Sequence, residues 1–316
     1  MMEMELLDRR VERLLREIKT LACERARDVA DIEIALRQAS LDDASVGQWQ
    51  PFANGGEWGG EQRWWDFRFT ARVPEGYTGK QLRLELTTGC EGAWDATNPQ
   101  FEVFVNGELR QAVDTNHTEV LLGEGVAADA SFDVYLKAYC QTDAGRHARL
   151  YARTVEVAPN VLGLYYDVRV PLEAVALLPR DSRTRLNALE AMSDSLNCLD
   201  LRDPGSEAFY ASVDAARECM QREYYEALCA REPEVIANCV GHTHIDVAWL
   251  WDLEQTRHKA VRSFATVLEL MRRYPEYVFM SSQPVLYKFV KEDAPALYDQ
   301  IKQRIAEGRW ECEGGM

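Results

Sequence analysis

The spacing of apolar residues changes along this chain, and the change restricts the fold more than any other feature. Between Trp64 and Val170, apolar and polar residues alternate, as they do in β-strands that bury one face. Asn106-Gly107 supplies a favoured hairpin turn in this region. We predict an antiparallel β-sandwich of the jelly-roll or galactose-binding type over residues 45–170. The alternating apolar positions include Trp65, Phe67, Phe69, Ala71, Leu82, Leu84, Leu86, Phe101, Val103, Val105, Val134, Leu136, Ala138, Tyr151 and Val155.

Apolar residues at three- and four-residue steps predict helices on both sides of this region. One or two helices are expected from Leu6 to Leu36, within an N-terminal helical segment of residues 1–44. Their apolar stripe needs a partner. Packing within the chain is the favoured interpretation, and a subunit contact in a homo-oligomer is the alternative. A helical connector is expected over residues 171–232, beginning at Pro171 and interrupted by an Asp-Pro-Gly turn.

Strand and helix patterns alternate over residues 233–316, as at the start of a parallel, barrel-like α/β domain. Because three parallel strands cannot close a barrel, we expect this domain to be incomplete and the chain to be the front part of a longer protein. The overall prediction is a multi-domain α+β protein. The expected elements are strand Val235–Val240, helix Arg257–Tyr274, strand Tyr277–Ser281, helix Pro284–Glu307 and strand Arg309–Glu313.

Composition excludes several classes of partner. The 316 residues carry a net charge of −16, which would repel both a nucleic-acid backbone and an anionic membrane. Five of the first ten residues are charged, no apolar segment follows a basic one there, and no run approaches a membrane span, so a cytoplasmic protein is expected. Eight scattered cysteines without a Cys-x-x-Cys pair fit free thiols better than a disulfide framework or a zinc ribbon.

The candidate site lies directly after the strand predicted at Val235–Val240. His242, His244 and Asp246 are two residues apart, so in an extended chain their side chains point to one side, at the strand end where α/β domains place their active sites. Imidazole nitrogens and carboxylate oxygens are good ligands for zinc-like cations. The alternative is a pair of histidines that bond local backbone in a turn, but the clustering favours a metal site.

The string Gly-His-Thr-His-Ile-Asp-Val-Ala-Trp-Leu-Trp, which ends at Trp251, resembles the metal-binding signature of glycoside hydrolase family 38 α-mannosidases, whose pattern is His-x-His-x-Asp-x-x-Trp. The resemblance implies that His244 and Asp246 bind zinc and that Trp249 contacts the mannose. It also implies that His242 orients the site by hydrogen bonds without binding the metal directly. The likeness is to the bacterial and cytosolic branch. It continues through Arg257, Arg262-Ser263-Phe264, Ser281-Ser282-Gln283 and Glu307-Gly308-Arg309-Trp310-Glu311.

The resemblance also implies the reaction, which is hydrolysis of terminal α-linked mannose from oligosaccharides with retention of configuration at the sugar carbon. A carboxylate acts as the nucleophile, and a second carboxylic acid protonates the leaving oxygen. In the family the nucleophile Asp follows a Gly-Gly pair, which here is Gly314-Gly315, so the Asp is expected just after Met316. The last zinc-ligand His is expected further along the chain. We therefore expect no catalytic residue within this chain, and no activity from residues 1–316 alone. The carboxylates nearby are expected to be helix starts or strand-end charges, namely Asp252, Glu254, Glu311 and Glu313.

Two other functions are compatible with these residues. A different metal-dependent hydrolase, of the amidohydrolase type, would use His242 as well as His244 as a direct ligand. A non-enzymatic protein would use the β-sandwich to bind carbohydrate or to assemble with other proteins. Aromatic residues could serve that last role, although packing is the commoner use of tryptophan in such domains. The tryptophans concerned are Trp49, Trp58, Trp64 and Trp94.

Overall fold

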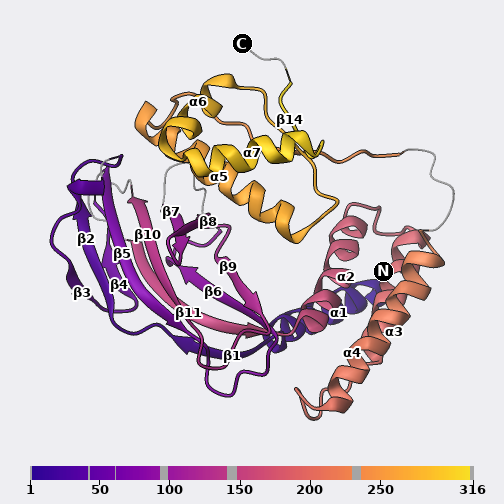
Figure 1. Cartoon of the computed structure of the whole chain (residues 1–316). Helices are drawn as coiled ribbons and strands as arrows, with labels where there is room; N and C mark the ends of the chain where they lie inside the picture. The colour runs from indigo at the N-terminus through magenta and orange to yellow at the C-terminus, as the bar shows by residue number, and fades with distance from the viewer. Residues whose placement is uncertain are drawn as a thin grey trace. The chain divides into compact units, whose positions relative to one another are not determined.

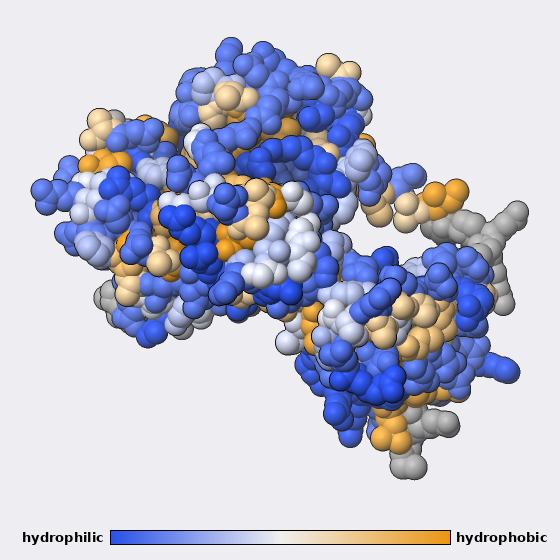
Figure 2. Space-filling view, turned by 60° about the horizontal axis from the view of Figure 1, so that its bottom comes forward, coloured by the Kyte–Doolittle hydropathy of each residue, from blue (hydrophilic) through white to orange (hydrophobic). Residues whose placement is uncertain are grey.

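A computed structural model gives the fold (Figure 1). It describes residues 2–41, 43–60, 62–92, 99–140, 148–229 and 236–313. Helices, antiparallel sheets and a small parallel sheet near the C-terminal end are all present, so the mixed α+β class predicted from the sequence is confirmed. No described helix is both long enough and apolar enough to cross a membrane. Figure 2 shows a face covered mostly by hydrophilic residues, with hydrophobic ones in small patches.

The chain divides into two compact units. The helical unit consists of Met1–Ala26, Pro74–Leu82 and Val155–Ile236. The sheet unit consists of Arg27–Val73, Arg83–Thr154 and Ala237–Met316. The predicted boundaries near residues 44, 170 and 232 stay a prediction.

The helical unit contains four long helices, and short polar side chains set the starts of two of them. Ser182 caps one helix by accepting a hydrogen bond from the Arg185 N–H, and Ser206 caps the next through Phe209. A single π-helical stretch, Gln221–Glu226, follows the last of them. The helices are α1 (Met2–Leu21), α2 (Pro159–Ala176), α3 (Arg183–Asn197) and α4 (Glu207–Met220).

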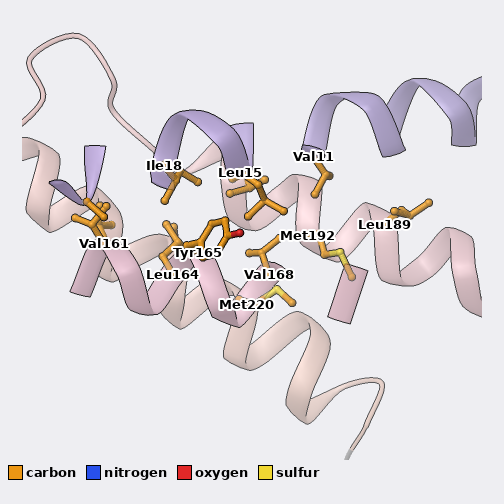
Figure 3. Packing of buried hydrophobic residues seen from close by; sticks show 14 of the residues in the cluster. Val11, Leu15, Ile18, Val161, Leu164, Tyr165, Val168, Leu189, Met192 and Met220 are labelled. Atoms are coloured by element: carbon orange, nitrogen blue, oxygen red, sulfur yellow. The ribbon is translucent and has the colours of Figure 1, made fainter. Parts of the chain in front are cut away.

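Apolar side chains fill the space between these helices. Figure 3 shows Leu15 and Ile18 of α1 close to Leu164 and Tyr165 of α2, with Met192 of α3 nearby. Each of these side chains is at least 95% buried. The apolar stripe of the N-terminal helix is therefore covered within the chain, by helices far away in sequence.

Two antiparallel sheets contain most of the described strands. The large sheet has the order β3-β2-β5-β10-β7-β8, and the second sheet has the order β1-β11-β6-β9 with β4 paired to β11. The strands of the large sheet are β2 (Ile32–Arg37), β3 (Gln50–Phe52), β5 (Arg63–Arg72), β7 (Gln100–Val105), β8 (Glu108–Val113) and β10 (Ser131–Cys140). Those of the second are β1 (Cys23–Asp28), β4 (Gly56–Trp58), β6 (Gln81–Thr87), β9 (Glu119–Glu124) and β11 (Ala148–Val157).

Tryptophan packs the two sheets against each other. Trp58 of the second sheet is 3% exposed, and its ring centroid lies 5.3 Å from that of Phe67 and 5.4 Å from that of Phe101, both in the large sheet. Trp64 is also buried. These two tryptophans are packing residues, whereas Trp49 is half-buried, and Trp94 lies outside the described residues.

The third sheet is small and parallel, with the order β12-β13-β14. Phe264, Phe279 and Trp310 meet at its core, with the Phe279 and Trp310 centroids 4.6 Å apart. The strands of this sheet and the helices between them are β12 (Gly241–His242), α5 (Leu253–Arg273), β13 (Phe279–Met280), α6 (Pro284–Asp293), α7 (Pro295–Ala306) and β14 (Trp310–Glu311).

The helix predicted from Leu6 to Leu36 is wrong beyond Leu21, because β1 and β2 follow α1. Ile32, Ile34 and Leu36 are two residues apart, and pairing of β2 with β3 and β5 satisfies their backbone groups. Tertiary pairing therefore overrode a short helical pattern.

The predicted helical connector also needs correction at both ends. Helix α2 begins at Pro159, where proline is well tolerated because the first helical N–H has no partner to lose, and Pro171 lies inside the helix. The helix predicted from Ser206 towards Cys229 is α-helical only as far as Met220.

The strand predicted at Val235–Val240 is wrong in its position. Val235 lies outside the described residues, Ile236 and Val240 are 77% and 53% exposed, and the strand is Gly241–His242. Among the described residues β12 pairs with β13 alone, and residues 236–240 before it belong to no strand.

The other predicted elements of this region are shorter or divided. The two strands after α5 are two residues long each, and Pro295 separates α6 from α7 where one helix was expected. Helix α5 begins at Leu253, earlier than predicted.

Candidate functional site

The predicted site begins on β12, where the backbone packs closely. A side chain at Gly241 would place its Cβ 2.1 Å from the Tyr277 hydroxyl oxygen, so a larger residue there would require the Tyr277 ring to move. The neighbouring His242 has its Nδ1 atom 2.9 Å from the Met280 carbonyl oxygen. Because a carbonyl only accepts, Nδ1 carries the hydrogen, and a neutral His242 ring keeps its Nε2 lone pair.

His244 and Asp246 come together as the two-residue spacing predicts. The His244 Nε2 atom lies 3.1 Å from Asp246 Oδ1, and the two side chains are 75% and 43% exposed. Ile245 between them is 4% exposed and packs into the core beneath. The local chain therefore alternates as an extended segment does, with polar side chains outward and the apolar one inward.

The separation of His244 Nε2 and Asp246 Oδ1 suits two ligands of one zinc ion. Two ligands about 2 Å from a tetrahedral zinc would be about 3.3 Å apart, close to the separation of these two atoms. The described residues contain no group of three or more His, Cys, Asp or Glu placed to hold a metal. Here the chain offers two suitable ligands that are already neighbours.

The loop after Asp246 carries the tryptophans. Ala248 has a φ of 64°, in the left-handed region that a residue with a Cβ seldom adopts. Trp249 follows it and is 59% exposed. Its ring meets that of Trp251 edge-on at 5.7 Å, and the Lys259 ammonium lies 4.2 Å from the Trp251 ring centroid.

The acidic residues close to the motif have structural partners. Asp252 caps α5 by accepting a hydrogen bond of 2.8 Å from the Gln255 N–H, which places it at a helix start as predicted. Glu254 accepts a hydrogen bond from the Ser40 N–H at 3.3 Å. Glu311 lies on β14, and Glu313 is exposed just after it.

Helix α5 carries a row of polar residues, four apart, that face the sheets; we call it the α5 polar stripe. Because the helix repeats every 3.6 residues, positions four apart share one face. The contacts are those of Glu254 with Ser40, of His258 with Glu102 at 2.5 Å, of Arg262 with the side-chain oxygen of Gln100, and of Thr266, whose hydroxyl accepts from the Ala112 N–H at 3.0 Å.

The centre of the α5 polar stripe is a buried His–Glu pair. His258 and Glu102 are each 3% exposed, and the Trp64 ring centroid lies 4.1 Å from that of His258. Burial alone would raise the pKa of Glu102, but the neighbouring His258, Lys137 and Arg262 lower it below its ordinary value. The pair therefore favours a charged Glu102 carboxylate.

A hollow of about 390 Å³ adjoins the motif. Residues from β8, β12, α5 and the loop between β12 and α5 line it, including His242, His244 and Trp251. Its lining also includes Asp114, His117, Lys259, Arg262 and Tyr277. Sequence reasoning missed Asp114 and His117, because no local signal joins the segment after β8 to a motif so far along the chain.

His117 and Asp114 form a second His–Asp pair beside this hollow. His117 Nδ1 lies 2.9 Å from Asp114 Oδ1. Burial would raise the pKa of Asp114, but its hydrogen bonds with the His117 side chain and the attraction between them lower it.

Residues 234–316 match the glycosyl hydrolases family 38 N-terminal domain. The chain is related to the family 38 α-mannosidases. It is 25% identical over 263 residues to "Alpha-mannosidase G" of Dictyostelium discoideum, covering 79% of this chain and 23% of that protein. It is 33% identical over 162 residues to "Alpha-mannosidase" of Saccharomyces cerevisiae, covering 48% and 14%.

A third relative is human "Alpha-mannosidase 2C1", 27% identical over 269 residues, covering 80% of this chain and 24% of that protein. The chain thus spans at most about a quarter of the length of these relatives. A solved structure of the "CBM51-2 and INT domains from Clostridium perfringens ZmpB" is 16% identical, covering 68% of this chain and 44% of that one, with a TM-score of 0.20. At that score it carries no argument about the fold.

Proposed function

We propose that this chain is the N-terminal part of a zinc-dependent retaining α-mannosidase that removes terminal α-linked mannose from oligosaccharides. The observation that carries the proposal is the His244–Asp246 pair, 3.1 Å apart, within the family 38 match. A zinc ion held there would act as a Lewis acid toward sugar hydroxyl oxygens. The exposed Trp249 would offer its ring face to the apolar side of the sugar.

The remaining chemistry is assigned to sequence outside this chain. By resemblance to the family, the nucleophile Asp and the last zinc-ligand His follow Met316, and residues 1–316 alone do not hydrolyse mannosides. His242 bonds to the Met280 carbonyl oxygen and so links β12 to β13. In this proposal it orients the site by hydrogen bonds without binding the metal directly. The cytoplasmic location and a homo-oligomer stay predictions.

Zinc titration of this chain by calorimetry tests the site. His244→Ala is expected to weaken zinc binding at least about tenfold, because it removes one of the two ligands assigned to the proposed site. His117→Ala is the matched control: it removes the other exposed histidine that is paired with an aspartate, and zinc binding should be unchanged. Equal losses in both variants would contradict the assignment.

The activity is tested on the complete gene product with an aryl α-mannoside. We expect release of mannose that a chelator abolishes and zinc restores. His242→Ala separates this proposal from an amidohydrolase-like enzyme, since the Nε2 atom of His242 is also suited to metal binding. A partial loss of metal binding fits α-mannosidase, and complete loss together with amide or ester hydrolysis fits the other class.

A further inference from the structure

The hydroxyl of Thr256 has all its hydrogen-bonding capacity in use. It accepts from the Ala248 N–H at 3.1 Å and from the Trp251 indole N–H at 3.2 Å, and it donates to the Asp252 carbonyl oxygen at 3.0 Å. A hydroxyl has one hydrogen to donate and two lone pairs, so no capacity remains. Thr256 itself is fully buried in the first turns of α5.

Two of these hydrogen bonds hold the loop around Trp249. One fixes the residue just before it, Ala248, whose left-handed φ of 64° is unfavourable for an alanine and persists only where other contacts impose it. The other fixes Trp251, whose ring meets that of Trp249 edge-on. The Trp249 N–H also bonds to the Trp251 carbonyl oxygen at 3.1 Å. The position of the exposed Trp249 ring thus depends on one buried hydroxyl.

Helix α5, which carries Thr256, is itself fixed in place. The α5 polar stripe joins it to the large sheet through Glu102 and Gln100 and to the turn after β2 through Ser40. The buried members of the stripe lose hydrogen bonds if the helix slides or rotates, so this interface restricts both motions. Sheet, helix, Thr256 and loop form one continuous series of contacts.

We infer that Thr256 is a positioning residue that holds Trp249 in the orientation needed at the site, with α5 and the large sheet as its support. The sugar-facing part of this inference rests on the proposed function. The positioning itself concerns the folded chain alone and is measured without substrate or metal.

Hydrogen exchange followed by NMR on residues 1–316 tests the inference. Thr256→Val keeps the branched shape and removes both acceptor positions. We expect the Ala248 amide and the Trp251 indole N–H to exchange about five- to tenfold faster, which is the effect of losing a hydrogen bond of ordinary strength. Thr256→Ser keeps the hydroxyl and should restore slow exchange at both groups.

Thr266→Val is the matched control on the same helix. The Thr266 hydroxyl also accepts one backbone N–H, from Ala112, and donates to the carbonyl oxygen four residues before it, that of Arg262. This variant removes one of the four stripe contacts, so exchange should rise most at Ala112 and much less at Ala248 and Trp251 than in Thr256→Val. Unchanged exchange at Ala248 in Thr256→Val, or a uniform increase across the sheet unit, would overturn the positioning role.

The complete gene product separates this inference from the proposed function. If it hydrolyses an aryl α-mannoside, Thr256→Val should lower kcat/KM about tenfold and Thr256→Ser should restore it, because a misplaced ring costs binding in the transition state. Full activity in Thr256→Val would overturn the sugar-facing part. If the wild-type protein hydrolyses no mannoside, the proposed function fails, and the exchange result still decides the positioning role.

Discussion

The two units of this protein hold their helices by opposite means. In the helical unit, α1 to α4 meet through buried apolar side chains such as Leu15, Leu164 and Met192. In the sheet unit, α5 meets the large sheet through the α5 polar stripe, with His258 and Glu102 buried as a pair. Apolar packing contributes more free energy and restricts orientation less, whereas buried polar pairs contribute less and must be correctly aligned. The aligned interface lies next to the candidate site.

The largest expected effect is in the apolar core. Leu164→Ala should destabilise the helical unit by about 2–5 kcal/mol, since Leu164 is fully buried and its removal leaves a cavity. Leu177→Ala, at a position 89% exposed, is the matched control and should have almost no effect. The measurement is denaturant unfolding followed by circular dichroism.

Tryptophan fluorescence shows which unit loses stability in Leu164→Ala. All eight tryptophans lie in the ranges of the sheet unit. In Leu164→Ala the circular dichroism transition should therefore move to lower denaturant concentration while the fluorescence transition stays. A common shift in both signals would mean that the two units unfold together, and the comparison between them would lose its basis.

A smaller effect is expected in the polar interface. Glu102→Gln keeps the shape and one acceptor but removes the charge that faces His258, and it should destabilise the sheet unit by about 1–3 kcal/mol. Tryptophan fluorescence during denaturant unfolding measures it. A gain in stability would show that the buried pair is maintained for alignment at the expense of stability.

Acid should weaken the same interface. The folded pKa of Glu102 lies below its ordinary value of 4.5, so its contribution to stability is present above that pH and is lost as the pH falls through the folded pKa. Wild type and Glu102→Gln should differ in unfolding free energy at pH 7 and converge in strong acid. A difference that stays constant with pH would exclude the carboxylate charge as the cause.

The smallest effect is expected on the exposed part of the same sheet. Glu33 accepts from Arg68 at 2.6 Å, with both side chains more than a third exposed. Glu33→Gln makes the same chemical change as Glu102→Gln and should leave the fluorescence transition unmoved, because water screens this pair. Equal losses in the two variants would show that burial is not what distinguishes the α5 interface.

The sequence by itself determined the mixed class, the stretch of alternating strands and the motif with its two-residue spacing. These are local properties, because strand alternation sets the direction of each side chain without reference to any partner. The family resemblance began from the same short motif and continued along the segments that follow it. His244 and Asp246 could therefore be placed on one side of the chain before any tertiary contact was known.

Only the tertiary structure decided which local patterns became strands and what supports the motif. Ile32 to Leu36 is a strand because β5 pairs with it, and Val240 is not, because no described strand does. Glu102 reaches His258 across 156 positions of the chain. The hydroxyl of Thr256 matters only because Ala248 adopts a left-handed conformation beside it. Such partners depend on the folded path of the chain, which no short-range pattern encodes.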